Sequence, residues 1–195
     1  MSGTGQQKEV KRKVTLVGIR PIMFDRYPGD NKTQLAARDK AYLVNGNQLV
    51  LPVENIFSFL TATNTTSAPK RLLDKREYKD VCSAFACFVD INPSDNIPFT
   101  RNGKPITIGT FDGDHDELSG IRIDHRVARL EKGVPNPKAR PVLPLPWELS
   151  FEITLLKNGE VNESMLKTMF EDGGIVVGLG TFRGRYGKFA VKTWE

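Results

Sequence analysis

The residues best suited to chemistry lie in the last eighteen positions of the chain. Glycines at 178, 180, 184 and 187 alternate with a set of cationic and aromatic residues: Phe182, Arg183, Arg185, Tyr186 and Lys188. Glycine permits positive φ angles and close backbone approach. Arginine can bind phosphate through its forked donors, and aromatic rings can stack on bases. The segment therefore predicts a nucleic-acid-binding loop joined to a final strand. The alternative is a glycine-rich hairpin whose arginines lie in water.

The charge of the chain is basic and unevenly distributed. The 195 residues have a formal net charge of +5 at pH 7. Residues 8–13 and 178–195 each contain four basic residues and one acidic residue. Such clusters favour polyanionic partners, although they also serve solubility.

An acidic stretch at residues 112–117 is the strongest candidate for a metal site. In the EF-hand pattern Glu117 stands where glycine is needed, and Ile123 stands where the bidentate glutamate is needed. We interpret the stretch as a solvated loop. The chain contains no Walker loop, nucleophile elbow or zinc motif, so we expect no cofactor and no metal.

The two histidines are the candidates for acid–base catalysis. His115 lies inside the acidic stretch, and His125 lies between Asp124 and Arg126. A metal-independent ribonuclease needs a base near the 2′-hydroxyl, and His125 could supply it. The alternative is a histidine on the surface of a strand.

Cysteine usage and the N-terminus indicate the cell compartment. Cys82 and Cys87 have a spacing that fits neither a zinc knuckle nor a redox pair, and we expect both to be buried. Residues 1–7 are polar and lack the apolar core of a signal peptide, and no window is apolar enough to span a membrane. We expect a cytoplasmic protein.

Hydrophobic periodicity predicts six core elements, four strands and two helices. In chain order they are strand, helix, strand, strand, helix and strand, at residues 14–19, 53–61, 121–130, 147–156, 162–172 and 188–194. This order is typical of the ferredoxin-like α+β fold, an antiparallel sheet with two helices on one face and the other face free to bind. We expect one domain over residues 1–195, with its core at 14–63 and 119–195 and a large insertion at about 64–118.

Glycine and proline positions predict the connections. Asn45-Gly46 and Asn102-Gly103 are strong signals for tight hairpins. Residues 133–146 contain five prolines and are expected to lack regular structure.

Two segments resemble the RAMP superfamily of CRISPR-associated proteins. Those proteins have ferredoxin-like domains with a glycine-rich loop before the final strand. Gly178-Leu-Gly180 followed by Arg183-Gly-Arg-Tyr-Gly-Lys-Phe189 is similar to that loop. Residues 49–60 resemble the strand, proline and helix start of the family, although no glycine follows Pro52. The C-terminal segment is also similar to uncharacterised phage and prophage proteins.

The resemblance implies a non-catalytic subunit that binds single-stranded RNA or DNA largely through its backbone. The contacts would come from the loop residues Gly178, Gly180, Phe182, Arg183, Gly184, Arg185, Tyr186, Gly187 and Lys188. It also implies a possible homo-oligomer or filament along the strand. In some related subunits a catalytic aspartate follows the first strand, where Asp25 and Asp30 lie here, although both also suit turns. The alternatives are an endoribonuclease using His125 and a module that binds only proteins.

Overall fold

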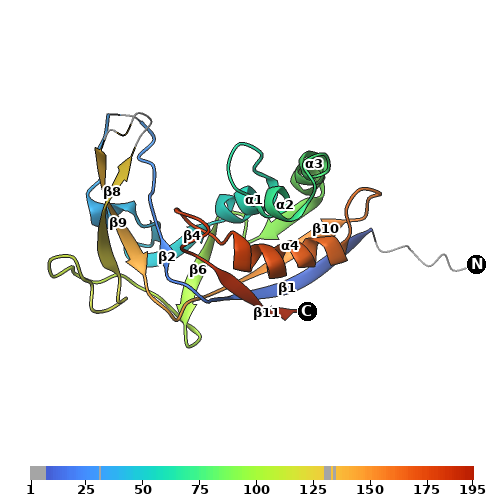
Figure 1. Ribbon diagram of the computed structural model, residues 1–195. Helices are drawn as coiled ribbons and strands as arrows, with labels where there is room; N and C mark the ends of the chain where they lie inside the picture. Colours follow the sequence, from blue (N-terminus) through green and yellow to red (C-terminus); the bar gives the residue numbers. More distant parts are fainter. Residues whose placement is uncertain (1–7, 31, 130–132, 134) are drawn as a thin grey trace, which may run out of the picture.

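The chain folds around a large antiparallel sheet with a second, smaller sheet beside it (Figure 1). The computed structural model describes residues 8–30, 32–129, 133 and 135–195. The polar N-terminus at residues 1–7 and the end of the expected strand at Leu130 lie outside the described residues. The strands are β1 (Glu9–Gly18), β2 (Ile22–Met23), β3 (Leu43–Val44), β4 (Gln48–Pro52), β5 (Val89–Asn92), β6 (Asn96–Arg101), β7 (Lys104–Pro105), β8 (Arg122–Arg129), β9 (Pro135–Leu143), β10 (Glu148–Leu156) and β11 (Phe189–Trp194). The helices are η1 (Ala37–Lys40), α1 (Glu54–Thr61), α2 (Ala68–Leu72), α3 (Tyr78–Phe88) and α4 (Glu163–Val176).

The large sheet has ferredoxin-like topology. Strand β1 lies between β11 and β10, and β5 pairs with β10 on the other side, all antiparallel. Along the chain these elements read β1, α1, β5, β10, α4 and β11, which is the expected order of strands and helices. Strands β6, β4 and β3 extend the sheet beyond β10. The predicted α+β, ferredoxin-like class is confirmed.

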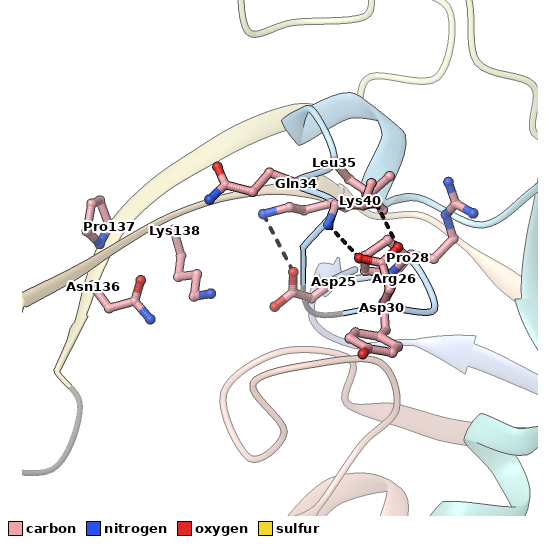
Figure 2. A pocket seen from close by; sticks show the side chains of 12 residues that line it. Asp25, Arg26, Pro28, Asp30, Gln34, Leu35, Lys40, Asn136, Pro137 and Lys138 are labelled. Carbon is pink, nitrogen blue, oxygen red and sulfur yellow. Dashed lines mark hydrogen bonds and ion pairs between the residues drawn. The ribbon is translucent and has the colours of Figure 1, made fainter.

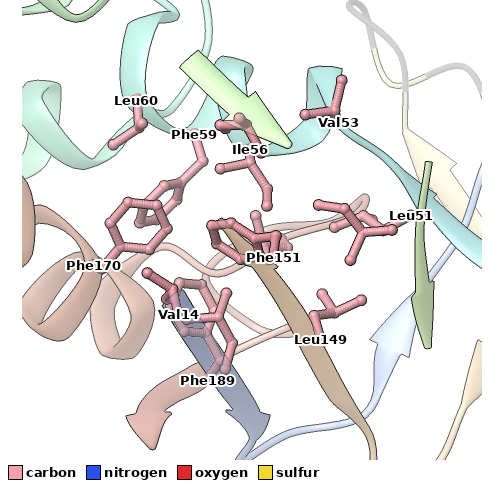
Figure 3. Close-up of a cluster of buried hydrophobic side chains, with 14 of the residues drawn as sticks. Val14, Leu51, Val53, Ile56, Phe59, Leu60, Leu149, Phe151, Phe170 and Phe189 are labelled. Atoms are coloured by element: carbon pink, nitrogen blue, oxygen red, sulfur yellow. The ribbon is translucent and has the colours of Figure 1, made fainter. Parts of the chain in front are cut away.

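Alternation along the strands separates a buried face from an exposed one. In β10 the odd-numbered residues Leu149, Phe151, Ile153 and Leu155 are buried, whereas the residues between them are polar. The buried face packs on the helices through a cluster of aromatic rings (Figure 3). The ring centroid of Phe59 in α1 lies 5.6 Å from that of Phe170 in α4 and 5.5 Å from that of Phe189 in β11. This core fixes the end of α4 and the start of β11, and so both ends of the glycine-rich loop.

Helix α4 begins where the sequence places its cap. The Asn162 side chain accepts a hydrogen bond of 2.9 Å from the Met165 N–H. Arg12 of β1 donates to Glu163 in the first turn and holds the pKa of that carboxyl below its usual range. Among the described residues, no helix is long and apolar enough to cross a membrane.

The strand expected at residues 121–130 does not belong to the large sheet. It forms β8, which pairs with β9 in a three-stranded sheet completed by β2. Strand β5, only four residues long, is the second core strand instead. Residues 64–118, expected as an insertion, therefore contribute α2, α3, β5 and β6 to the same core. The hydrophobic periodicity of residues 121–130 predicts a strand, but it does not predict that this strand pairs with β9.

The expectation that residues 133–146 lack regular structure is wrong, because Pro135–Leu143 forms β9. Pro135, Pro137 and Pro141 all stand at odd-numbered positions of this strand. At this parity the backbone groups point away from β8: the Pro141 carbonyl accepts from Phe24 N, and the Ala139 carbonyl accepts from Lys40. The missing proline N–H groups therefore remove no hydrogen bond between β8 and β9.

The expectation of two buried cysteines is half wrong. Cys82 is buried, and burial raises the pKa of its thiol, whereas Cys87 is exposed. Five residues advance about 140° around an α-helix, so the two side chains face opposite sides of α3.

Candidate nucleic-acid interface

The loop between α4 and β11 needs its glycines. Gly178, Gly180, Gly184 and Gly187 all have positive φ angles. A Cβ atom on Gly187 would lie 1.9 Å from the Leu179 carbonyl oxygen, and one on Gly180 would lie 2.6 Å from the Met23 carbonyl oxygen. Gly184 has open space instead. Positions 187 and 180 therefore require glycine for close packing as well as for conformation.

Backbone hydrogen bonds fix this loop against the segment that follows β1. Thr181 N donates to Met23 O at 2.9 Å, and Gly187 N donates to Pro21 O at 2.8 Å. Within the loop, Leu179 N donates to Gly187 O at 2.9 Å. The loop is therefore a rigid platform on which its side chains have defined positions.

Arg183 points into the protein rather than outward. Its guanidinium donates to Gly180 O at 3.3 Å, to Thr66 O at 3.0 Å and to the Ser58 hydroxyl at 3.2 Å. Burial lowers the pKa of this side chain, but a guanidinium stays protonated in proteins. Arg183 thus connects the loop to α1 and to the α1–α2 connection, and places a positive charge beneath the loop.

Phe182, Tyr186 and Arg126 of β8 form a compact cluster. The Arg126 guanidinium carbon lies 5.6 Å from the Phe182 ring centroid and 5.1 Å from the Tyr186 ring centroid. The two ring centroids are 6.0 Å apart. Tyr186 is buried against Met23 and Val142, and its hydroxyl accepts a hydrogen bond from Arg126. Phe182, by contrast, remains 50% exposed.

Asp124 orients the arginine of this cluster. Its carboxylate accepts two hydrogen bonds from Arg126, and this pairing holds the pKa of Asp124 below its usual range. The β8–β9 hairpin, which stands at one end of the molecule away from α3 (Figure 1), is thereby joined to the glycine-rich loop. Sequence reasoning missed Arg126 as a site residue, because nothing in the pattern brings position 126 to position 186.

Three further cationic residues are near this cluster: two are its neighbours in sequence, and the third is hydrogen-bonded to one of these through its backbone. Arg185 is exposed and Lys188 is half-buried. Arg20 is exposed, and its backbone N–H donates to Lys188 O at 3.2 Å. Sequence reasoning also missed Arg20, since it lies directly after the first strand with no motif around it. Of the nine predicted loop residues, Phe182 and Arg185 are the side chains presented to solvent.

Asp25 lies in a polar cavity of about 390 Å³ between the 25–35 segment and β9 (Figure 2). Its carboxylate pairs with Arg140 at 2.7 Å and with Lys40 at 3.7 Å. Asp30 accepts hydrogen bonds from Lys32 N and Thr33 N, which makes it a turn residue. Both aspartates therefore have structural partners.

The histidines and the acidic stretch lie near the hairpin. His125 Nε2 lies 2.9 Å from the Asp114 carboxylate, and both side chains are exposed. Asp116 is fully buried and accepts from Gly109 N, Ser119 N and the Ser119 hydroxyl. Burial raises the pKa of Asp116, but these hydrogen bonds outweigh it and leave the pKa below its usual range. The acidic stretch is thus organised around one buried carboxylate.

The exposed face of the large sheet carries charges of both signs. Lys11 pairs with Glu9 at 3.1 Å and Lys192 pairs with Glu148 at 2.9 Å. Thr15 and Ser150 share a hydrogen bond of 3.1 Å across β1 and β10. Carboxylates therefore oppose two of the cations on this face, which weakens its attraction for a phosphate backbone.

Comparison with known proteins finds similarity in structure but not in sequence. No protein-family model matches the chain, and no curated protein matches it by sequence. Among solved structures, it is similar to a chain in the cryo-EM structure of the type III-B Cmr-beta bound to cognate target RNA. The TM-score is 0.49 and the sequence identity 12%, and the similarity covers 96% of this chain. The chain spans 60% of the length of the chain that it matches. At this level the similarity assigns no function.

Proposed function

We propose that this protein binds single-stranded nucleic acid, RNA or DNA, at the surface formed by the glycine-rich loop and the β8–β9 hairpin. We further propose that it is a non-catalytic relative of the RAMP proteins that its sequence resembles. The observation that carries the proposal is the half-exposed Phe182 ring, held on a rigid loop and supported by Arg126.

The backbone of Phe182 supports a role for its side chain. Its φ angle is +56°, a conformation that costs a bulky residue free energy, and the surrounding hydrogen bonds of the loop maintain it. The ring is thereby kept half-exposed instead of folding into the core. An exposed aromatic ring of fixed orientation suits stacking on an unpaired base.

The cations beside this ring suit the phosphates of a strand. Arg185 is exposed and can form forked hydrogen bonds with a phosphate. Arg126 and Tyr186 contact the Phe182 ring, and the glycines maintain the conformation of the loop. We therefore assign positioning roles to Arg126, Tyr186 and the glycines. The guanidinium of Arg183 adds a positive charge on the inner side of the loop. Stacking combined with backbone contacts gives binding with little sequence preference and strong salt dependence.

Fluorescence-anisotropy titration tests the proposal. The parent and two variants, Phe182→Ala and Arg185→Ala, would be titrated into labelled single-stranded RNA, single-stranded DNA and duplex at 50 and 200 mM salt. Loss of one stacked base costs about 1–3 kcal/mol, so Phe182→Ala is expected to weaken single-strand binding by about 5- to 150-fold. Weaker binding of the parent at 200 mM salt is also expected.

The matched control is Leu118→Ala, which truncates another exposed apolar side chain, directly after the acidic stretch. It should bind as the parent does. A folded parent that binds none of the three polymers at 50 mM salt contradicts the proposal and favours a protein-only partner. Equal affinities of parent and Phe182→Ala contradict the stacking role.

A further inference from the structure

A second cavity, of about 610 Å³, lies where the α1–α2 connection meets the start of α3. Its lining is cationic and polar, and it contains no carboxylate: Asn64, Thr65, Thr66, Lys70, Arg71, Lys75, Tyr78 and Lys79. Four positive charges therefore surround one concave surface. Neither the loop motif nor any element of the proposed function accounts for them.

These charges lack acidic partners within the part of the chain that the structure describes. The Lys70 amino group donates to the Thr63 carbonyl at 2.8 Å, and none of the four cations forms an ion pair. Asp74, close by in sequence, uses its carboxylate to accept from Arg76 N at 2.9 Å. The cavity of Figure 2 is different, because Asp25 there opposes Lys40. Unopposed like charges around a concave surface favour an anionic ligand.

The cavity and the glycine-rich loop are connected through one residue, Thr66. Thr66 lines the cavity, and its carbonyl accepts the hydrogen bond of 3.0 Å from Arg183 of the loop. The buried guanidinium thus lies between the loop surface and the lysines. Positive charge therefore lies on both sides of Thr66, from Arg183 on the loop side and from the cations that line the cavity.

We propose that this cavity binds backbone phosphates of the same single strand that stacks on Phe182, and so extends the binding path past the loop. The inference rests on the proposed function. The lysines would act as point charges on the phosphates, and Arg71 could bind one through its forked donors. The α1–α2–α3 surface then contributes affinity without reading sequence.

The salt dependence of binding measures these contacts. We would compare the parent, Lys75→Ala/Lys79→Ala and the loop variant Phe182→Ala with a labelled 15-nucleotide single-stranded RNA between 50 and 200 mM salt. Each phosphate contact contributes about 0.7 to the slope of log affinity against log salt on a single strand. Loss of two contacts should reduce the slope by about 1.4 and weaken binding at 50 mM salt. Thermal unfolding should not change, since both lysines are exposed.

The matched control is Lys13→Ala/Lys104→Ala, which removes two exposed charges elsewhere and should leave the slope within error of the parent. A slope reduced equally in both double variants overturns the inference in favour of a general charge effect. A pocket variant identical to the parent also overturns it, while weaker binding by Phe182→Ala would leave the proposed function standing. A parent that binds no strand overturns both.

Discussion

Two constraints act on the glycines of the loop: a positive φ angle, and close packing that leaves no room for a Cβ atom. Substitutions can separate the two. Gly184 and Gly187 both have positive φ angles, but only Gly187 lies against backbone atoms. Phe182 also has a positive φ angle, and this conformation keeps its ring exposed. We therefore regard the loop as a structure stabilised by close packing, from which one aromatic and one cationic side chain project.

Replacement of the two glycines by alanine should have unequal effects. Gly184→Ala is expected to cost about 1–2 kcal/mol of unfolding free energy, from the left-handed conformation alone. Gly187→Ala should cost about 1–3 kcal/mol more, because its Cβ would overlap the Leu179 carbonyl. Urea denaturation of both variants checks this. Equal losses would mean that the loop relaxes around the added methyl group.

At the scale of elements, the contact between the β8–β9 hairpin and the loop depends on one ionised carboxylate. Asp124 orients Arg126, which in turn contacts both loop aromatics. The pKa of Asp124 is lower in the folded protein than its ordinary value, so its ionised form stabilises the fold. That stabilisation is complete above the unfolded pKa and is lost as the pH falls through the folded pKa.

Asp124→Asn should therefore be less stable than the parent near pH 7, by about 1–3 kcal/mol, with a difference that shrinks below about pH 4. Urea denaturation from pH 7 to pH 2.5 measures this difference. The control Asp90→Asn changes an exposed carboxyl on β5 and should follow the parent at every pH. A constant deficit in Asp124→Asn down to pH 2.5 would contradict the account.

The elements also show how far sequence reasoning reaches. Strict alternation over Trp147–Leu155 and the cap at Asn162 identified β10 and α4 directly, since both signals are local. Strand β5 has four residues and no such signal, and β8 has a clear pattern that does not specify its partner. The glycine-rich loop was predictable for the same local reason, whereas its contact with Arg126 depends on chain packing.

At the scale of the whole molecule, charge is distributed asymmetrically around a sheet face that carries charges of both signs. On the exposed face, Lys11 pairs with Glu9 and Lys192 pairs with Glu148. Unopposed cations gather instead on the loop and around the α2–α3 cavity. We therefore propose that nucleic acid binds on the loop and helix side, and not on the open face of the sheet that the fold class led us to expect.

Photocrosslinking of single-stranded RNA to the protein, followed by mass spectrometry of the crosslinked peptides, tests directly whether the glycine-rich loop binds nucleic acid. The account predicts crosslinks at Phe182 and in the surrounding 178–188 segment, lost on addition of unlabelled RNA. Crosslinks confined to the exposed sheet face, on β1 and β10, would contradict it.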